Sequence, residues 1–128
     1  MTRRWFLAFI LSLVPAMGLA GCGLQSEAPT DEQTRAYTEK HPPKGEPVDF
    51  WIYTHCGVEH TRIGGKWWLA DPPLYRDDGP AEPPEGWDNP YQKGRLVVFW
   101  PNRAVFSARG TDVELVPSQT GEPKRHCK

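Results

Sequence analysis

The sequence predicts an all-β domain, either a small barrel or a curved antiparallel sheet of five or six short strands. Short runs of β-branched and aromatic residues, separated by glycine and proline, fill the chain after residue 47. No helical periodicity competes with them there. Closing the sheet into a barrel would remove the open edges at which strands of different molecules pair. A flexible N-terminal tether and one long loop rich in proline and glycine complete the expected organisation.

Three strands are expected early in the folded part, over residues 48–55, 58–63 and 66–69. The first carries apolar side chains at alternate positions, which is typical of a strand with one buried face. Gly64 and Gly65 separate the second strand from the third and permit the positive φ angles of a tight hairpin. On the third strand Trp67 and Trp68 point to opposite faces, so at most one of them joins the inner core.

A long loop is expected over residues 70–94, where six prolines alternate with glycines and acidic residues. Neither a helix nor a central strand tolerates this density of proline. Three more strands follow, over residues 95–100, 103–108 and 113–116. The first of these is apolar on both faces, so we expect it at the centre of the sheet, with Trp100 in the core.

The chain divides into a signal peptide over residues 1–21, a lipidated cysteine with its tether over residues 22–46, the all-β domain over residues 47–117 and a tail over residues 118–128. The tether is polar and buries too little to offset the cost of ordering it. Thr30 and Gln33 have the spacing of a helix capping box, so the tether can contain one or two helical turns. The tail is polar apart from Cys127 and is loose unless that cysteine holds it.

Residues 1–21 have the three parts of an export signal: a basic start, an apolar run and a small-residue end. Leu19-Ala20-Gly21-Cys22 resembles the lipobox of bacterial lipoproteins. The resemblance implies cleavage before Cys22, a diacylglyceryl group on that cysteine, and a mature chain anchored by lipid on the extracytoplasmic face of the cell membrane. Thr2-Arg3-Arg4-Trp5-Phe6-Leu7 also resembles the twin-arginine export motif, so this route and general secretion both stay open.

The charge pattern after residue 21 excludes a nucleic-acid partner. The remaining chain carries 13 basic against 16 acidic residues and shows no basic stripe. No later stretch approaches the ~20 apolar residues of a membrane span. We therefore expect contact with the membrane through the lipid on Cys22, and an envelope glycan or protein as the partner.

Two cysteines, Cys56 and Cys127, remain once lipid claims Cys22, and in an exported protein a disulfide between them is the default expectation. The alternative is a small thiol- or metal-dependent module, because His60 is near Cys56 and His126 adjoins Cys127. The spacing of these four residues departs from that of structural zinc sites. We therefore expect a binding or accessory domain with no catalytic residue, metal ligand or cofactor.

The number of tryptophans is unusually high for this length of chain, since five tryptophans lie within residues 51–100. Tryptophan often fills the core of a small β domain. The other interpretation is an aromatic platform, rimmed by the proline-rich loop, that stacks on a sugar ring or docks a proline-rich peptide. For that platform the candidate ligand-binding residues are Trp68, Trp87 and Tyr91, with Trp87 exposed on the loop.

The body of the chain, over residues 48–117, resembles small actinobacterial lipoprotein domains. The likeness lies in His55-Cys56-Gly57 after the first strand, Gly65-Lys66-Trp67-Trp68, Asp71-Pro72-Pro73-Leu74 and Pro84-Glu85-Gly86-Trp87. No catalytic or ligand residues are assigned to that group, so the resemblance implies no site residue here.

Overall fold

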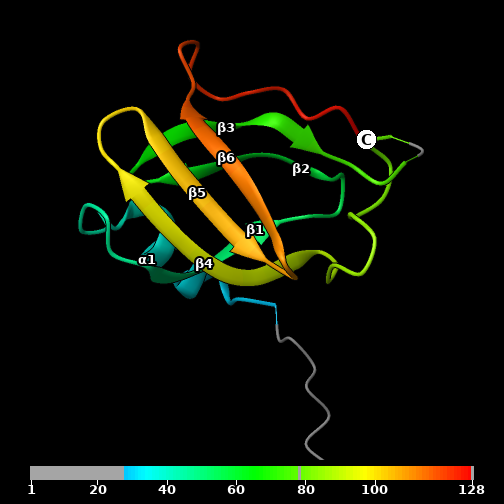
Figure 1. Cartoon of the computed structure of the whole chain (residues 1–128), viewed down its shortest axis with the longest axis horizontal. Coiled ribbons are helices and arrows are strands. Elements are labelled where there is room, and N and C mark those ends of the chain that lie inside the picture. The colour runs from blue at the N-terminus through cyan, green and yellow to red at the C-terminus, as the bar shows by residue number, and fades with distance from the viewer. Residues whose placement is uncertain (1–27, 78, 128) are drawn as a thin grey trace, which may run out of the picture.

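A computed structural model describes residues 28–127 except residue 78. In this part of the chain six antiparallel strands form one curled sheet, a half-barrel, accompanied by one short helix (Figure 1). The predicted all-β fold class is therefore confirmed. The predicted signal peptide and the lipidated Cys22 lie outside the described residues. Among the described residues, no helix is long and apolar enough to cross a membrane.

The elements are α1 Asp31–Glu39, β1 Val48–Tyr53, β2 Val58–Ile63, β3 Lys66–Leu74, β4 Tyr91–Phe99, β5 Arg103–Ala108 and β6 Thr111–Pro117. The strands lie in the order β1-β4-β5-β6-β3-β2, so β1 and β2 form the edges of the sheet. The curl brings these two edges into contact, and α1 contacts both of them. β1 and β2 are not paired with each other, and we call the line along which they meet the seam. α1 lies against the seam.

One face of the curled sheet encloses the core, because alternate residues of a strand point to opposite faces. The fully buried side chains include Phe50 and Ile52 on β1, Trp68 on β3 and Phe106 on β5. Trp68 is buried whereas its neighbour Trp67 is only partly buried, as the strand pattern predicts. The two-glycine hairpin is also confirmed, with φ angles of 57° at Gly64 and 74° at Gly65.

The proline-rich loop is shorter than predicted, because strands extend into it from both sides. β3 continues through Pro72 and Pro73, beyond Ala70, where its described pairing with β6 ends. Prolines fit there because no partner on that side needs their missing N–H groups. β4 begins at Tyr91 and includes Gly94, where an added Cβ would lie 2.5 Å from the Ser107 carbonyl oxygen. Gly94 is thus required by close packing within the sheet.

The prediction that the strand of residues 95–100 lies at the centre is wrong. β4 is second in the order, and β5 and β6 occupy the middle of the sheet. Its outer side chains are apolar because other groups cover them: Phe99, for example, lies beneath the Arg103 guanidinium, 5.2 Å from the ring centroid. Apolar residues on both faces of a strand therefore indicate that its outer face is covered. They do not indicate where the strand lies in the sheet.

The described part of the predicted tether, residues 28–46, contains α1 and contacts the sheet. Thr30 and Gln33 form the capping box of α1, with Gln33 N donating to Thr30 Oγ1 at 3.2 Å. Tyr37 packs on Trp51 with ring centroids 4.7 Å apart, and His41 stacks on Trp100 at 3.6 Å. These contacts hold α1 against the sheet, so the packed domain begins near Thr30.

The C-terminal tail is also held. Cys56 and Cys127 are joined by a disulfide with Cα atoms 5.6 Å apart, within the usual range for such a bond. The predicted disulfide is therefore supported, and it brings the residues before Cys127 against β2.

Candidate functional site

The sequence-based ligand residues do not form one site. Trp68 has no exposed surface and Trp87 is only 8% exposed, so the prediction that Trp87 is exposed on the loop is wrong and neither ring is open to a ligand in this structure. The loop turns inward where Trp87 N donates to the Pro84 carbonyl at 3.0 Å. The Trp87 ring then packs on Phe106, with centroids 6.0 Å apart. The loop thus covers one part of the core, and only Tyr91 is left on a surface groove.

That groove has a volume of about 290 Å³ and runs along the seam. We call it the seam groove; its lining comprises Thr34, Thr38, Trp51, Tyr53, His60, Thr61, Arg62, Trp67, Tyr91 and Arg125. These residues come from α1, from β1 to β4 and from the tail. The volume is at the small end of the range of about 300–1,000 Å³ for small-molecule sites.

One wall of the seam groove is aromatic and belongs to β1 and β4. Trp51 and Tyr53 alternate with buried residues of β1 and therefore lie on its outer face. Tyr91 is the cross-strand partner of Tyr53, and their rings meet edge to face with centroids 5.5 Å apart. Lys93, opposite Trp51, places its Nζ 4.8 Å from the centroid of that ring. The wall is thus a row of three rings held in place by strand register.

The other wall belongs to β2 and β3 and centres on Trp67. Arg62, its cross-strand partner, lies 5.6 Å from the ring centroid, and the His60 ring stands nearly perpendicular to it at 5.5 Å. Arg62 is fixed by Glu39 Oε1 at 3.1 Å and by the Gly65 carbonyl at 3.0 Å. Burial, reinforced by the charge of Arg125, lowers the pKa of His60 below 6.5, so this ring is neutral at neutral pH.

The C-terminal tail contributes Arg125, whose guanidinium lies 4.3 Å from the centroid of the Tyr53 ring. The two residues after it are anchored: Cys127 by the disulfide, and His126 by Glu59. Thr34 and Thr38 face the groove from α1. Both terminal segments of the described chain therefore border the seam groove.

Glu59 is a buried carboxylate next to the seam groove, but its contacts are structural. It accepts hydrogen bonds from Tyr75 Oη at 2.7 Å and from His126 Nδ1 at 2.8 Å. Burial acts to raise the pKa of Glu59, but these hydrogen bonds together outweigh burial and the pKa is lowered. Burial and the bond to Glu59 raise the pKa of Tyr75 to about 12. An ionised carboxylate with these partners clamps the tail to the sheet.

Cys56 and Cys127, the two cysteines within the described residues, offer no free thiol because they are bonded to each other. His55, next to Cys56, is exposed and hydrogen-bonds Asn89 at 3.0 Å. Across residues 28–77 and 79–127, no group of three or more His, Cys, Asp or Glu side chains is placed to hold a metal ion.

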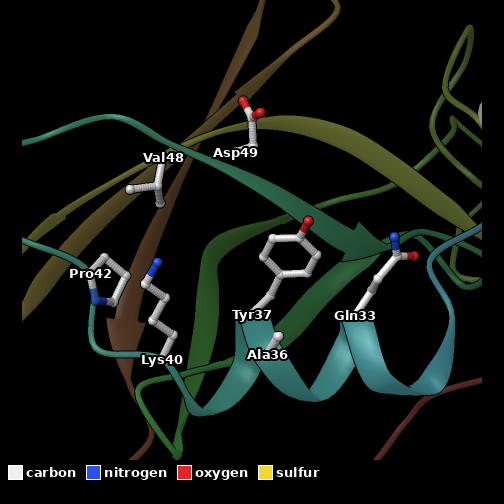
Figure 2. A pocket seen from close by; sticks show the side chains of 7 residues that line it. All are labelled: Gln33, Ala36, Tyr37, Lys40, Pro42, Val48 and Asp49. Carbon is white, nitrogen blue, oxygen red and sulfur yellow. The ribbon is translucent and has the colours of Figure 1, made fainter.

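A second groove, of about 300 Å³, lies between α1 and the start of β1 (Figure 2). We call it the helix groove; it is lined by Gln33, Ala36, Tyr37, Lys40, Pro42, Val48 and Asp49. Figure 2 shows Tyr37 and Lys40 rising from α1 toward the strand. Tyr37 of the helix groove packs on Trp51 of the seam groove, so the two grooves are neighbours. The helix groove is lined by one tyrosine and no tryptophan, whereas the seam groove is lined by two tyrosines and two tryptophans.

The sequence carried a signal for part of the seam groove. Trp51 and Tyr53 alternate with buried residues, and Trp67 points to the face of its strand opposite to that of Trp68. The outward orientation of these three side chains therefore follows from strand periodicity. Nothing in the sequence indicates that β1 and β2 approach each other across the seam, or that Arg125 returns to Tyr53. Comparisons with family models, curated proteins and solved structures find no match for this chain.

Proposed function

We propose that this chain is a lipid-anchored domain of the extracytoplasmic face that binds a sugar through the seam groove and catalyses no reaction. One observation carries the proposal. The rings of Trp51, Tyr53, Trp67 and Tyr91 converge on one groove at the surface, although the core of this small domain is filled by other side chains.

Aromatic rings at a groove suit a sugar because the C–H face of a pyranose packs on the face of a ring. Tyrosine adds a hydroxyl that donates and accepts hydrogen bonds beside the apolar ring. Trp51 Nε1 and Arg62 Nε, like Trp68 Nε1 in the core, are buried without an acceptor among the described residues. Buried donors without partners are costly and call for an explanation. Sugar hydroxyls would supply acceptors to the first two after a small side-chain rotation.

The lipid anchor is proposed from the lipobox that ends at Cys22. With α1 beginning at Asp31, residues 23–30 join the lipidated cysteine to the packed domain. Eight residues reach at most roughly 28 Å. The proposed anchor therefore keeps the domain, and with it the seam groove, close to the membrane surface.

Binding without catalysis is supported by the state of the reactive side chains. A disulfide sulfur is neither a thiolate nucleophile nor a zinc ligand, which argues against the thiol- or metal-dependent alternative. Glu59 is held ionised by Tyr75 and His126, so it is poorly suited to act as a general acid.

A glycan array probed with the purified chain tests the proposal, followed by calorimetry with the best-binding oligosaccharide. Trp67→Ala should weaken binding about fivefold or more, because one well-placed aromatic contact contributes on the order of 1 kcal/mol. Phe99→Ala is the matched control, since Phe99 is an outward-facing aromatic residue away from the groove. Equal losses in both variants, or binding to proline-rich peptides in place of glycans, would refute sugar binding in the groove.

A further inference from the structure

We infer that the sugar in the seam groove carries a carboxylate, and that Arg125 binds this group. The inference rests on the proposed function and specifies its ligand.

The charge of the seam groove is opposite to that of the chain. The full sequence has a formal net charge of −1. The charged residues that line the groove within the described chain are Arg62 and Arg125, and no carboxylate lines it. Because Arg62 is paired with Glu39, Arg125 supplies the positive charge of the groove, and this charge favours an anionic ligand over a neutral one.

Three carboxylates near the groove are already engaged, whereas Asp31 and Glu32 on α1 and Glu122 on the tail form no ion pair among the described residues. Glu39 pairs with Arg62 at 3.1 Å, and Asp49 pairs with Arg95 at 2.9 Å. Glu59 is held by Tyr75 and His126. None of these acids pairs with Arg125, and in residues 28–127 apart from 78 no ion pair is formed by that guanidinium.

Arg125 is nevertheless held in position. Its guanidinium lies over the Tyr53 ring at 4.3 Å, and the next two residues are fixed to β2 and to the loop before it. An arginine positioned by an aromatic ring loses little freedom on binding, and its planar fork matches a carboxylate through two parallel hydrogen bonds. A sugar stacked in the groove would thus present its carboxylate to a cation that is already in place.

The experiment compares two tetrasaccharides of equal length by calorimetry on the full chain in detergent at 0.15 M salt. The hyaluronan tetrasaccharide alternates carboxylated and neutral rings, and chitotetraose has neutral rings only. The charged probe should bind about tenfold more tightly, as expected for one charge-assisted contact. Arg125→Gln should remove this preference while leaving the affinity for chitotetraose unchanged.

Arg103→Gln is the matched control, because Arg103 also lies over an aromatic ring, that of Phe99 at 5.2 Å, but away from the groove. The control should keep the preference. Equal affinity of the wild-type chain for both probes would overturn the inference and leave sugar binding standing. Binding of neither probe by folded chain overturns both. A preference that survives in Arg125→Gln, or that disappears in Arg103→Gln as well, overturns the role of Arg125.

Discussion

The Glu59 carboxylate accepts a hydrogen bond from His126 Nδ1 at 2.8 Å, although the two residues are 67 positions apart in the chain. The backbone N–H of His126 donates to the same carboxylate at 3.3 Å. Together with the adjacent disulfide, this contact determines where Arg125 lies. Arg125 on the C-terminal tail is therefore a fixed part of the seam groove.

Glu59→Gln should lower the free energy of unfolding by about 1–3 kcal/mol, because hydrogen bonds to a charged acceptor are replaced by weaker ones in a buried place. Urea denaturation of both proteins measures the difference. Glu114→Gln is the control, because this residue forms a solvent-exposed pair with Arg103 and such pairs contribute little to stability. A cost for Glu59→Gln no larger than that of the control would contradict the clamp.

The same carboxylate predicts how stability depends on pH. The pKa of Glu59 is lowered below its ordinary value of 4.5 in the folded state. Its contribution to stability is therefore complete above the pKa of the unfolded chain and is lost as pH falls through the lower folded pKa. Unfolding free energies measured from pH 6 downward should fall less steeply for Glu59→Gln than for wild type. Parallel pH profiles would show that another group controls acid unfolding.

The disulfide should be detectable by mass spectrometry, with Cys56 and Cys127 protected from alkylation until the protein is reduced. Cys127→Ser should destabilise the domain by about 4 kcal/mol, since the bond closes a loop between residues separated by 71 positions. If both thiols alkylate without reduction, the bond is absent, and the metal and thiol alternatives regain support.

Trp87→Ala should destabilise the domain more than Trp100→Ala, the reverse of the order that the sequence suggests. Trp87 is core, and truncation of a buried tryptophan costs about 3–5 kcal/mol. Trp100 is half-buried at the margin, where its Nε1 donates to the Pro42 carbonyl at 2.8 Å. Thermal melting of the two variants measures the order, and a larger loss for Trp100→Ala would mean that the proline-rich loop is not a cover for the core.

Cys22→Ala should abolish lipidation and leave the signal peptide attached, because the peptidase that recognises a lipobox requires the modified cysteine. Detergent phase partitioning and intact mass distinguish the outcomes. Normally processed variant protein in the detergent phase would end the lipoprotein proposal.

The sequence sufficed for the features that follow from local rules. The alternation of apolar side chains predicted the strands, Gly64 and Gly65 predicted the hairpin, and the two cysteines after residue 22 predicted the disulfide. These features need only the period of a strand, the φ angles of a turn and the number of cysteines that can pair.

Features that depend on distant partners were missed. Trp87 is buried although its segment has no periodic pattern, because Phe106 offers it a surface. The polar segment before β1 is ordered because two aromatic residues, Tyr37 and His41, find ring partners on the sheet. The seam groove was missed for the same reason, since strand periodicity gives the face of a side chain but not which edges meet.

The position of β6 between β5 and β3 has a consequence for biosynthesis. The strand made last joins β1, β4 and β5 to the hairpin of β2 and β3, so a growing chain that has not reached residue 117 holds two unconnected pieces of sheet. Each piece exposes an unpaired edge until then, and such edges invite pairing between chains. The fold must therefore be completed after the whole domain has emerged, and a ribosome paused before β6 would present an aggregation-prone intermediate.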